Sequence, residues 1–540
     1  MERGDTLMPT RREFLSAGLV GLLPKSTPRL PAGGFVHESQ DLGHALRDAR
    51  LPSAARASRR VPVVIVGGGI AGLSAAWQLQ RRGMGDFVIL EFEDDPGGNA
   101  RSGRNDVSAY PWAAHYVPVP DQKATLVREL FTDLGVLGAD GWDERHLCFT
   151  PRERLFIHGR WQDGLEPHTG PAQRDREQFA RFDELMSAFR ASGAFTIPSS
   201  RGLRAASAGT LDQQSMAAWL DAQRLDSPWL RWLVDYACRD DYGALARDVS
   251  AWAGVHYFAG RPEDERGPLT WPEGNGWVVS RLAQRMGERL RTRQPVTRVA
   301  RNGSRWTVET PTTTWSADAV IFAAPLWLAP WVVEGWREAA RLETSPWLVA
   351  NLTLDRWPRE AGLEPAWDNV IFDSPALGYV VATHQTLRTH VPRTVWTYYW
   401  ALAHTPARDA RRWLLDQSWA SLATHILDDL SRAHPDIRAC VSRLDILRLG
   451  HAMPRPTVGF LAHATRLRAQ ASRDGLHFAH SDVSGLPLFE EAQERGVAAA
   501  DAALARVGKR GGSPTRDVAP PPGDRPGVSR RPALDTAPEV

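Results

Sequence analysis

Residues 63–101 read VVIVGGGIAGLSAAWQLQRRGMGDFVILEFEDDPGGNAR, and this stretch decides the fold. Its first four residues, 63–66, are apolar and β-branched, as expected of a strand that is buried on both faces. Gly67, Gly69 and Gly72 follow with the spacing G-x-G-x-x-G. In this fingerprint the first glycine permits a tight turn, the second lets a pyrophosphate approach the backbone, and the third lets the next helix pack closely.

The residues after the glycines complete a βαβ unit. The pattern predicts a helix over 71–82, so the N–H groups near Ile70 and Ala71 should point at a phosphate. A second apolar strand is predicted over 87–90, and Glu91 ends it. Glu91 lies about 20 residues beyond the last glycine, where an acceptor for ribose hydroxyls is needed. The sequence therefore predicts a dinucleotide site.

A second glycine turn, Gly97-Gly98-Asn99-Ala100-Arg101, follows the acidic residue at a short distance. It resembles the corresponding turn of FAD-binding flavoproteins in the amine oxidase, protoporphyrinogen oxidase and phytoene desaturase superfamily. The resemblance implies FAD rather than NAD, with the phosphates near the flavin end contacted by Gly97, Gly98, Asn99 and Arg101. This chain departs from the family at Asn99, where the family has arginine.

Residues 110–116, YPWAAHY, occupy the place of a small-residue segment that runs beside the isoalloxazine ring in the resembled family. The resemblance implies that Ala113 and Ala114 contact the flavin. His115 and Tyr116 are then candidates to touch the flavin or the substrate. The alternative is a packed loop whose histidine is already hydrogen-bonded.

Downstream segments extend the resemblance to roughly residues 61–506. Residues 319–325, AVIFAAP, resemble the family's D-x-V-I-x-A-x-P strand, which implies a cofactor contact at Ala324. Val299, or Val296, would contact the adenine through its backbone.

The C-terminal part resembles the family's last cofactor segment. Asp482 is expected to contact the ribityl chain, although it sits one residue late and the family's glycine is replaced. A helix over about 490–506 would point its N-terminus, including Glu491, at the flavin carbonyl, where its dipole favours negative charge. Gly496 would let this helix pack tightly.

We therefore expect an α/β fold with two domains that are discontinuous in sequence. One is a Rossmann-like FAD-binding domain, a βαβ unit with an extra β-meander, and the other is a mixed α+β substrate domain. The expected segments are an export signal (1–34), a linker (35–60), FAD-binding parts (61–120, 270–344 and 446–507), a helical substrate part (121–269), substrate sheet and helices (345–445) and a disordered tail (508–540).

The substrate region gives weaker signals. Many amine oxidases of the family carry a lysine near residue 350 that holds a water beside the flavin, but this chain has lysine only at 25, 123 and 509. Trp396 and Tyr398 share one face of a predicted strand, which is either a cavity wall or a core face. An acidic, aromatic cluster over 235–242 would recognise a cationic substrate, or would form a solvated helix cap.

The composition and the N-terminus indicate the kinds of partner and the cellular location to expect. The net charge of +2 gives no sign of a nucleic-acid partner, and the three cysteines show no metal spacing and no disulfide framework. Arg11-Arg12 before the short apolar run 17–23 resembles a twin-arginine signal, the alternative being a basic tail. The signal implies a periplasmic protein that is exported after folding around its cofactor.

The expected function is that of an FAD-dependent oxidoreductase with non-covalent FAD. A small substrate would lose a hydride to flavin N5, and oxygen or a quinone would reoxidise the flavin. Amine oxidation, polyamines included, is the first expectation, with His115, Tyr116, Trp396 and Tyr398 as candidate catalytic residues. The alternatives are a desaturase or porphyrinogen-type oxidase acting on an apolar substrate, and a non-enzymatic flavin-binding protein.

Overall fold

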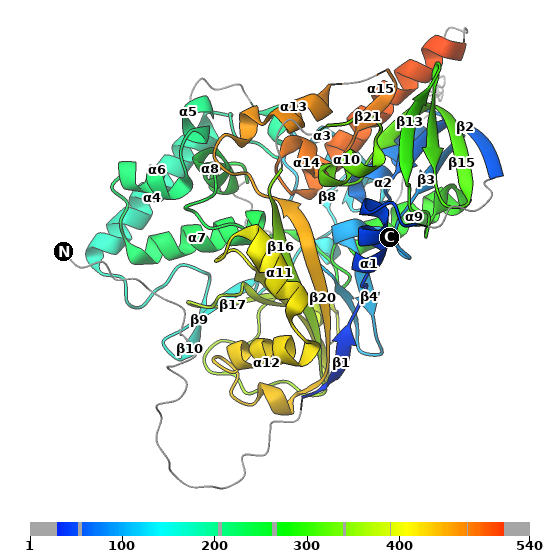
Figure 1. The fold of residues 1–540 in the computed structure, drawn as a ribbon. Coiled ribbons are helices and arrows are strands. Elements are labelled where there is room, and N and C mark those ends of the chain that lie inside the picture. The colour runs from blue at the N-terminus through cyan, green and yellow to red at the C-terminus, as the bar shows by residue number, and fades with distance from the viewer. Residues whose placement is uncertain are drawn as a thin grey trace, which may run out of the picture.

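The fold is built on two large β-sheets with helices packed around them (Figure 1). The computed structural model describes residues 30–51, 57–202, 208–261, 267–337, 342–388, 390–471 and 474–511. Residues 1–29 of the predicted export signal (1–34) and residues 512–540 of the predicted tail (508–540) lie outside this range, and residues 508–511 belong to a helix instead of the predicted disordered tail.

The seven-stranded sheet contains the glycine fingerprint. Its order is β12-β3-β2-β15-β14-β13, and β21 also pairs with β15. The parallel strands are β12 (Leu290–Arg291), β3 (Phe87–Leu90), β2 (Ala57–Val66), β15 (Thr313–Phe322) and β21 (Leu476–Phe478). The antiparallel meander adds β13 (Arg298–Asn302) and β14 (Arg305–Glu309).

Burial on both faces explains the continuous apolar run of β2. Val63 and Ile65 face the core formed with α2 (Ile70–Arg81) and α15 (Phe489–Gly511), whereas Val64 and Val66 face the core on the other side. Helices α2 and α15 pack directly on each other, because a Cβ at Gly496 would meet the carbonyl oxygen of Ala71 at 2.2 Å. The expected Rossmann-like domain with an added meander is confirmed.

The eight-stranded sheet belongs to the substrate domain. Its order is β1-β20-β16-β19-β18-β17-β9-β10. The strands are β1 (Ala32–Phe35), β20 (Val441–Pro454), β16 (Thr344–Leu354), β19 (Thr394–Ala401), β18 (Gly378–Val381), β17 (Asp368–Ile371), β9 (Glu153–Ile157) and β10 (Arg160–Asp163).

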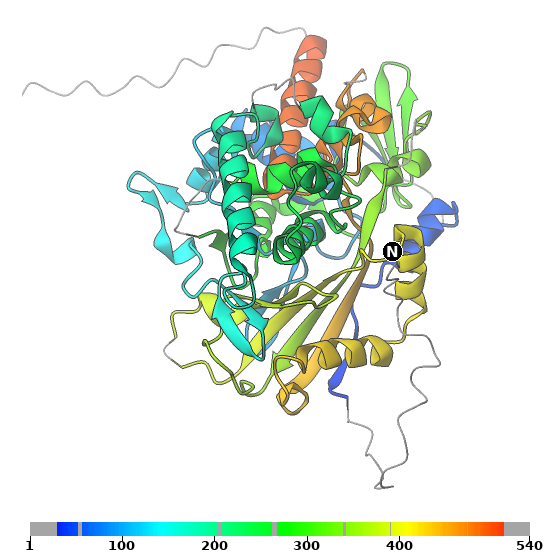
Figure 2. The same ribbon diagram turned by 90° about the vertical axis from the view of Figure 1, so that its left-hand side faces the viewer.

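Helices cover both faces of this second sheet (Figure 2). Helices α11 (Ala407–Asp416) and α12 (Trp419–Leu430) pack on one face. The other face meets a helical group through α7. This group comprises α4 (Gln173–Ala191), α5 (Ala208–Asp212), α6 (Met216–Ala222), α7 (Pro228–Tyr242) and α8 (Ala251–Ala259).

Short elements complete the described chain. The remaining helices are α1 (Gln40–Arg47), α3 (Thr125–Asp133), α9 (Gly276–Met286), α10 (Ala329–Val332), α13 (Ala464–Gln470) and α14 (Ser481–Ser484). Small strand pairs are β4 (Ser102–Arg104) with β5 (Ala109–Pro111), β6 (Tyr116–Val117) with β11 (Leu269–Thr270), and β7 (Leu137–Gly138) with β8 (Gly141–Trp142).

The predicted linker over 35–60 is wrong. Strand β1 crosses its first residue, α1 lies inside it, and β2 already begins at Ala57. An export signal ending at residue 34 would cut through β1. The substrate sheet also extends into the segment predicted to belong to the FAD domain, because β20 runs to Pro454.

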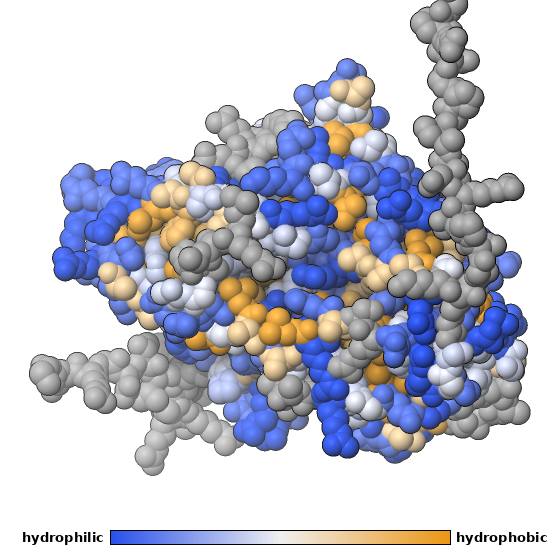
Figure 3. Space-filling model, turned by 90° about the horizontal axis from the view of Figure 1, so that it is seen from above, coloured by the Kyte–Doolittle hydropathy of each residue, from blue (hydrophilic) through white to orange (hydrophobic). Residues whose placement is uncertain are grey.

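The surface over α5, α13 and α15 is mostly hydrophilic, with apolar residues in separate small groups (Figure 3). Within the described ranges, no helix is long and apolar enough to cross a membrane. All three cysteines, Cys148, Cys238 and Cys440, are buried free thiols.

Candidate functional site

A cavity of about 1370 Å³ is lined by residues of the eight-stranded sheet, by residues that directly follow β2, β3 and β15 of the seven-stranded sheet, and by helices α1, α2, α7, α11 and α15. The glycine fingerprint and the second glycine turn lie in its wall, together with the carboxyl group of Glu91. The chemistry predicted from the first stretch of sequence therefore belongs to this cavity.

The glycine turn is shaped to receive a phosphate. A Cβ at Gly72 would lie 1.9 Å from the carbonyl oxygen of Gly67, so the third glycine is required for the approach of α2 to the turn. At Gly69 the nearest atom to a Cβ is the carbonyl oxygen of Gly97, at 3.9 Å. The backbone of Gly69 is thus bare toward the cavity, which Ile70 and Ala71 also line at the N-terminus of α2.

Glu91 closes the other side of this turn. Its two carboxylate oxygens accept hydrogen bonds from the N–H groups of Gly68 (2.6 Å) and Glu93 (2.8 Å). Burial raises the pKa of the Glu91 carboxyl, and these two N–H groups oppose the rise. A buried carboxylate with free lone pairs, held beside the glycine turn, suits ribose hydroxyl groups.

The second glycine turn joins the first. The N–H of Gly97 donates to the carbonyl oxygen of Gly68 at 2.9 Å, and Gly98 also lines the cavity. Arg101 is buried at the cavity wall, where its Nε donates to the carbonyl oxygen of Gly98 at 3.0 Å. The turn therefore places a guanidinium beside the phosphate cradle.

Asn99 takes a structural role in place of the family's arginine. Its side-chain amide donates to the carbonyl oxygen of Ala452 in β20, and its own carbonyl oxygen accepts the N–H of Ala114 at 2.8 Å. Asn99 thus connects the glycine turn to the substrate sheet and to the segment that carries Ala113 and Ala114, which both line the cavity.

His115 lies in the cavity wall as a neutral imidazole. Burial lowers its pKa to about 4. Its Nδ1 lies 3.1 Å from the carbonyl oxygen of Ala113, which can only accept, so Nδ1 carries the proton and Nε2 is an acceptor. The ring stacks on Tyr399 with centroids 4.8 Å apart, and the Tyr399 hydroxyl donates to the same carbonyl oxygen at 2.9 Å. Tyr116 also lines the cavity.

Carboxyl groups gather in the same cavity. Asp241 accepts two hydrogen bonds of 2.7 Å from Arg261, which neutralises it. Asp240 lines the cavity without a hydrogen bond or ion pair to any described residue. Its pKa is raised to about 7, mainly by burial and to a smaller extent by the negative charge of Asp241. Glu490 is 1% exposed, its Oε2 has no hydrogen-bond partner among the residues that the structure describes, and burial raises its pKa to about 7.

Ala324 and Asp482 line the cavity at the ends of the parallel strands. Asp482 accepts the N–H of Leu326 at 2.8 Å and lies 3.1 Å from Nδ1 of His480. Burial alone would raise the pKa of Asp482, but the His480 imidazole and this N–H hold it below the usual value.

Trp396 and Tyr398 do not reach the site. Both point to the opposite face of β19, into the core under α12. The ring of Trp396 stacks on that of Tyr379 with centroids 4.0 Å apart, and the Tyr398 hydroxyl donates a hydrogen bond to the carboxylate of Asp429 at 2.9 Å. The face of β19 that carries Trp396 and Tyr398 is thus the core face, which was one of the two alternatives, and Tyr399 on the other face lines the cavity. The assignment of Trp396 and Tyr398 as candidate catalytic residues does not agree with this placement.

Two residues predicted to contact the cofactor lie outside the cavity wall. Val299 lies in the outer meander, is not part of the cavity wall, and its carbonyl oxygen accepts the N–H of Glu334 at 2.9 Å. Glu491 points away from the cavity and accepts the N–H of Ser199 at 2.6 Å, whereas its neighbours Glu490 and Ala492 line the wall. One residue along a helix turns a side chain by about 100°.

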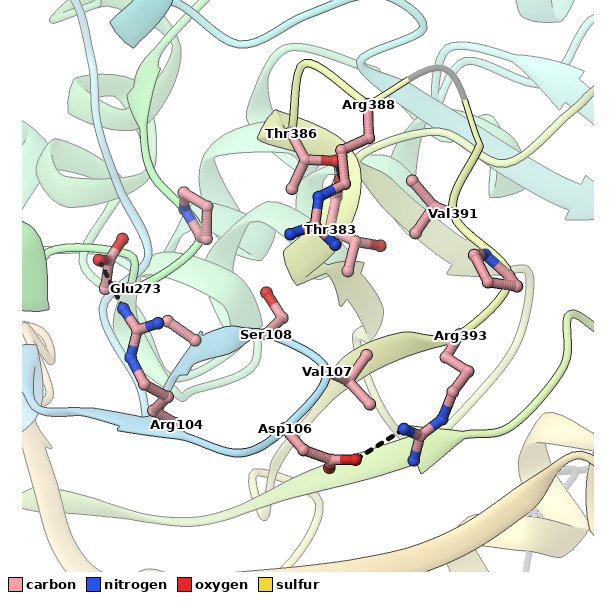
Figure 4. A pocket seen from close by; sticks show the side chains of 13 residues that line it. Arg104, Asp106, Val107, Ser108, Glu273, Thr383, Thr386, Arg388, Val391 and Arg393 are labelled. Atoms are coloured by element: carbon pink, nitrogen blue, oxygen red, sulfur yellow. Dashed lines mark hydrogen bonds and ion pairs between the residues drawn. The ribbon is translucent and has the colours of Figure 1, made fainter.

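A smaller pocket of about 330 Å³ lies between the β4–β5 hairpin and a segment that includes Thr386, Arg388 and residues 391–393 (Figure 4). Four of its charged side chains form two pairs: Arg104 lies 3.6 Å from Glu273, and Arg393 lies 2.6 Å from Asp106. No glycine of the phosphate cradle lines it, so the cofactor belongs in the large cavity.

Comparisons with known proteins agree with this site. The model of the family "Flavin containing amine oxidoreductase" matches residues 70–504. Hydroxyneurosporene desaturase of Cereibacter sphaeroides is 30% identical over 278 residues, which are 45% of this chain and 52% of the relative. A probable flavin-containing monoamine oxidase A of Dictyostelium discoideum is 22% identical over 278 residues, 49% of this chain and 58% of the relative.

The chain thus spans a little over half the length of these curated relatives. A solved structure of a putrescine oxidase variant has a TM-score of 0.65 at 18% identity and covers 83% of this chain and all of that one. The bare backbone at Gly69, the buried acceptor Glu91 and the guanidinium of Arg101 fit the phosphates and ribose of FAD. The chain belongs to the family of flavin-containing amine oxidoreductases, and FAD is its cofactor.

Proposed function

We propose that the protein oxidises a small amine with non-covalently held FAD. The observation that carries the proposal is the Asp240 carboxyl group, which lines the cavity without a partner among the described residues, close to the stacked His115 and Tyr399. Asp240 is half-buried, and the charges of Arg261 and Arg239 act on it without a hydrogen bond or ion pair, so a substrate ammonium would supply a direct positive partner. Polyamines are included among the candidate substrates, because Glu490 offers a second such carboxyl group.

The residues of the cavity suit the proton steps of amine oxidation. A carboxylate with a pKa near 7 binds an ammonium at neutral pH and can accept one proton from it, which leaves a neutral amine. The chemistry that FAD would supply at this site is acceptance of a hydride from the carbon next to this nitrogen. The substrate iminium would then be hydrolysed by water to an aldehyde and ammonia. His115 and Tyr399 would hold the amine by their aromatic faces, and His115 Nε2 would accept a hydrogen bond from it.

The alternative is a desaturase or porphyrinogen-type oxidase, and one observation favours it. The three lysines are Lys25, Lys123 and Lys509, and none lines the cavity in the part of the chain that the structure describes. Apolar residues such as Val349, Leu447 and Leu449 form another part of the wall. A reaction at a carbon–carbon bond would leave the carboxyl group of Asp240 unused.

Anaerobic reduction of the flavin separates these functions. The purified protein is mixed with primary amines and diamines, with allylic lipids and with porphyrinogens, and bleaching of the flavin absorbance is followed. Bleaching by amines with release of aldehyde supports the proposal. Bleaching only by the lipids or porphyrinogens supports the alternative, and a protein that binds FAD but is bleached by none of them is a flavin-binding protein without these activities.

Non-covalent attachment and the place of work are part of the same proposal. Cys148, Cys238 and Cys440 are all absent from the cavity wall, which supports a cofactor held without a thioether bond. The twin-arginine pattern supports export to the periplasm by the machinery for folded proteins, and oxygen or a quinone would be the electron acceptor.

A further inference from the structure

The first described residues form a bridge between the two domains. We name residues 30–47 the N-terminal clasp; it contains β1 and α1 and lies outside the region that matches the family. Strand β1 pairs in parallel with β20, from Ala32 opposite Arg443 to Phe35 opposite Ile446, and the N–H of Val36 continues the ladder. Figure 1 shows β1 along the end of β20 and α1 beside the other domain.

Side chains fix the clasp to both domains. On the substrate side, the guanidinium of Arg448 lies 3.8 Å over the ring of Phe35 and also pairs with Glu38. On the FAD side, Leu46 is 7% exposed and packs in the core that contains Val64, Val66 and Leu90. The clasp is therefore held by a cation–π contact and an ion pair at the substrate domain, and by apolar packing at the FAD domain.

The clasp also forms part of the cavity wall. The clasp residues that line the cavity are His37, Ser39, Gln40, Gly43, His44, Leu46 and Arg47. Ser39 donates a hydrogen bond to the carboxylate of Glu93, and the N–H of Glu93 in turn donates to Glu91, the ribose acceptor. The clasp thus covers the ribose end of the cofactor cavity.

We propose that the N-terminal clasp retains FAD, so that the cofactor leaves only when the clasp has detached from the sheet or from the FAD domain. A short wall element that is held by one four-residue strand and one eight-residue helix opens at a lower free energy than the sheets themselves. The rate of FAD release would then be set by opening of the clasp. This inference depends on the FAD site and not on the amine reaction, so it can fail while the proposed function stands.

Two neighbouring glycines provide a matched test. A Cβ at Gly33, where φ is +148°, would lie 1.8 Å from the carbonyl oxygen of Leu444, so Gly33→Ala should break the pairing of β1 with β20. A Cβ at Gly34 has no atom within 4 Å, which makes Gly34→Ala the control. Leu46→Asp would detach the other end by placing a carboxylate in the core.

The rate of FAD release is measured from the rise in free-flavin fluorescence after dilution of the FAD-bound protein. Hydrogen exchange of residues 32–47 shows whether the clasp has detached. We expect Gly33→Ala and Leu46→Asp to exchange rapidly in this segment and to release FAD about tenfold faster or more, a difference of about 1.4 kcal/mol in the opening step. Gly34→Ala should match the unchanged protein in both measurements.

The proposal would be overturned if the two variants show rapid exchange in the clasp and still release FAD at the original rate. It would also be overturned if Gly34→Ala accelerates release as much as Gly33→Ala does. Exchange of the parallel strands over 63–66 and 87–90 distinguishes detachment of the clasp from general unfolding, since these strands should stay protected in all three variants.

Discussion

Replacement of Gly69 and Gly72 by alanine should separate cofactor binding from folding. A Cβ at Gly72 would meet the carbonyl oxygen of Gly67 at 1.9 Å, whereas ordinary contact begins at 3.4 Å. Helix α2 must therefore move away from the turn, and forced packing of this kind costs about 1–3 kcal/mol. Gly72→Ala should lower the stability of the FAD-free protein and weaken FAD binding as well.

Gly69→Ala should act on the cofactor alone. The nearest atom to its Cβ is 3.9 Å away, and φ is −74°, which alanine adopts readily. Loss of the glycine as N-cap of α2 costs up to about 1 kcal/mol. The new methyl group, however, occupies the bare backbone where a phosphate must approach. Loss of one hydrogen bond to a charged phosphate costs about 1.5–3 kcal/mol, which weakens the Kd for FAD by about 10- to 150-fold.

The assay pairs thermal unfolding of the FAD-free protein with fluorescence titration of FAD for each variant. The expected pattern is a clearly lower unfolding temperature for Gly72→Ala and a nearly unchanged one for Gly69→Ala, with weaker FAD binding in both. If Gly69→Ala binds FAD within twofold of the unchanged protein, the glycine turn does not hold the phosphates and the placement of the cofactor is wrong.

Three other predictions follow from the site. The value of kcat/KM for an amine should rise through pH 7, since about 1% of Asp240 is ionised at pH 5 when its pKa is about 7. Asp240→Asn should lower kcat/KM about tenfold or more at pH 8 and much less at pH 5. The control variant Asp86→Asn, at an exposed position, should leave kcat/KM unchanged at both pH values. Trp396→Ala should lower the free energy of unfolding in denaturant by about 3–5 kcal/mol and leave KM unchanged. Tyr399→Phe should change the free energy of unfolding by no more than about 1.5 kcal/mol and raise KM. The reverse pattern would contradict the assignment of the two faces of β19. Under the proposed export, N-terminal sequencing of the processed protein should find a start before Ala32, because cleavage after residue 34 would remove most of β1. A start after residue 35 would show that the processed protein lacks β1 of the clasp.

The parts of the site that are contiguous in sequence could be predicted from it. Gly67, Gly69, Gly72 and Glu91 are fixed by one βαβ unit, whose geometry depends on neighbouring residues and hardly on the rest of the chain. The seven-stranded sheet follows from the same unit and from the apolar strand 319–322, which is inserted between β2 and β14. Local rules were sufficient where the contacts are local.

Contacts between distant segments could not be predicted in the same way. The alternation along β19 defines two aromatic faces, but only the packing of α12 on one of them shows that Tyr399 faces the cavity. Glu490 and Glu491 are neighbours on α15, so predicting which of them faces the cavity requires the exact start of this helix. The AGGF sequence of β1 has the composition of a loop and becomes a strand only through its pairing with β20.

The acidic cluster over 235–242 could be predicted only in part. Its position at the end of α7 and its capacity to bind a cation were both considered from the sequence. The structure adds the difference between Asp241, which Arg261 neutralises, and Asp240, which has no partner among the described residues. That difference depends on a residue 20 positions away along the chain.

The most direct test of the account is an anaerobic titration of the purified protein with a primary amine. The account predicts one FAD per chain and complete bleaching of the flavin, with one aldehyde and one ammonia formed for each FAD reduced. A protein that carries no FAD, or whose flavin is bleached by dithionite and by no amine in the panel, would contradict it.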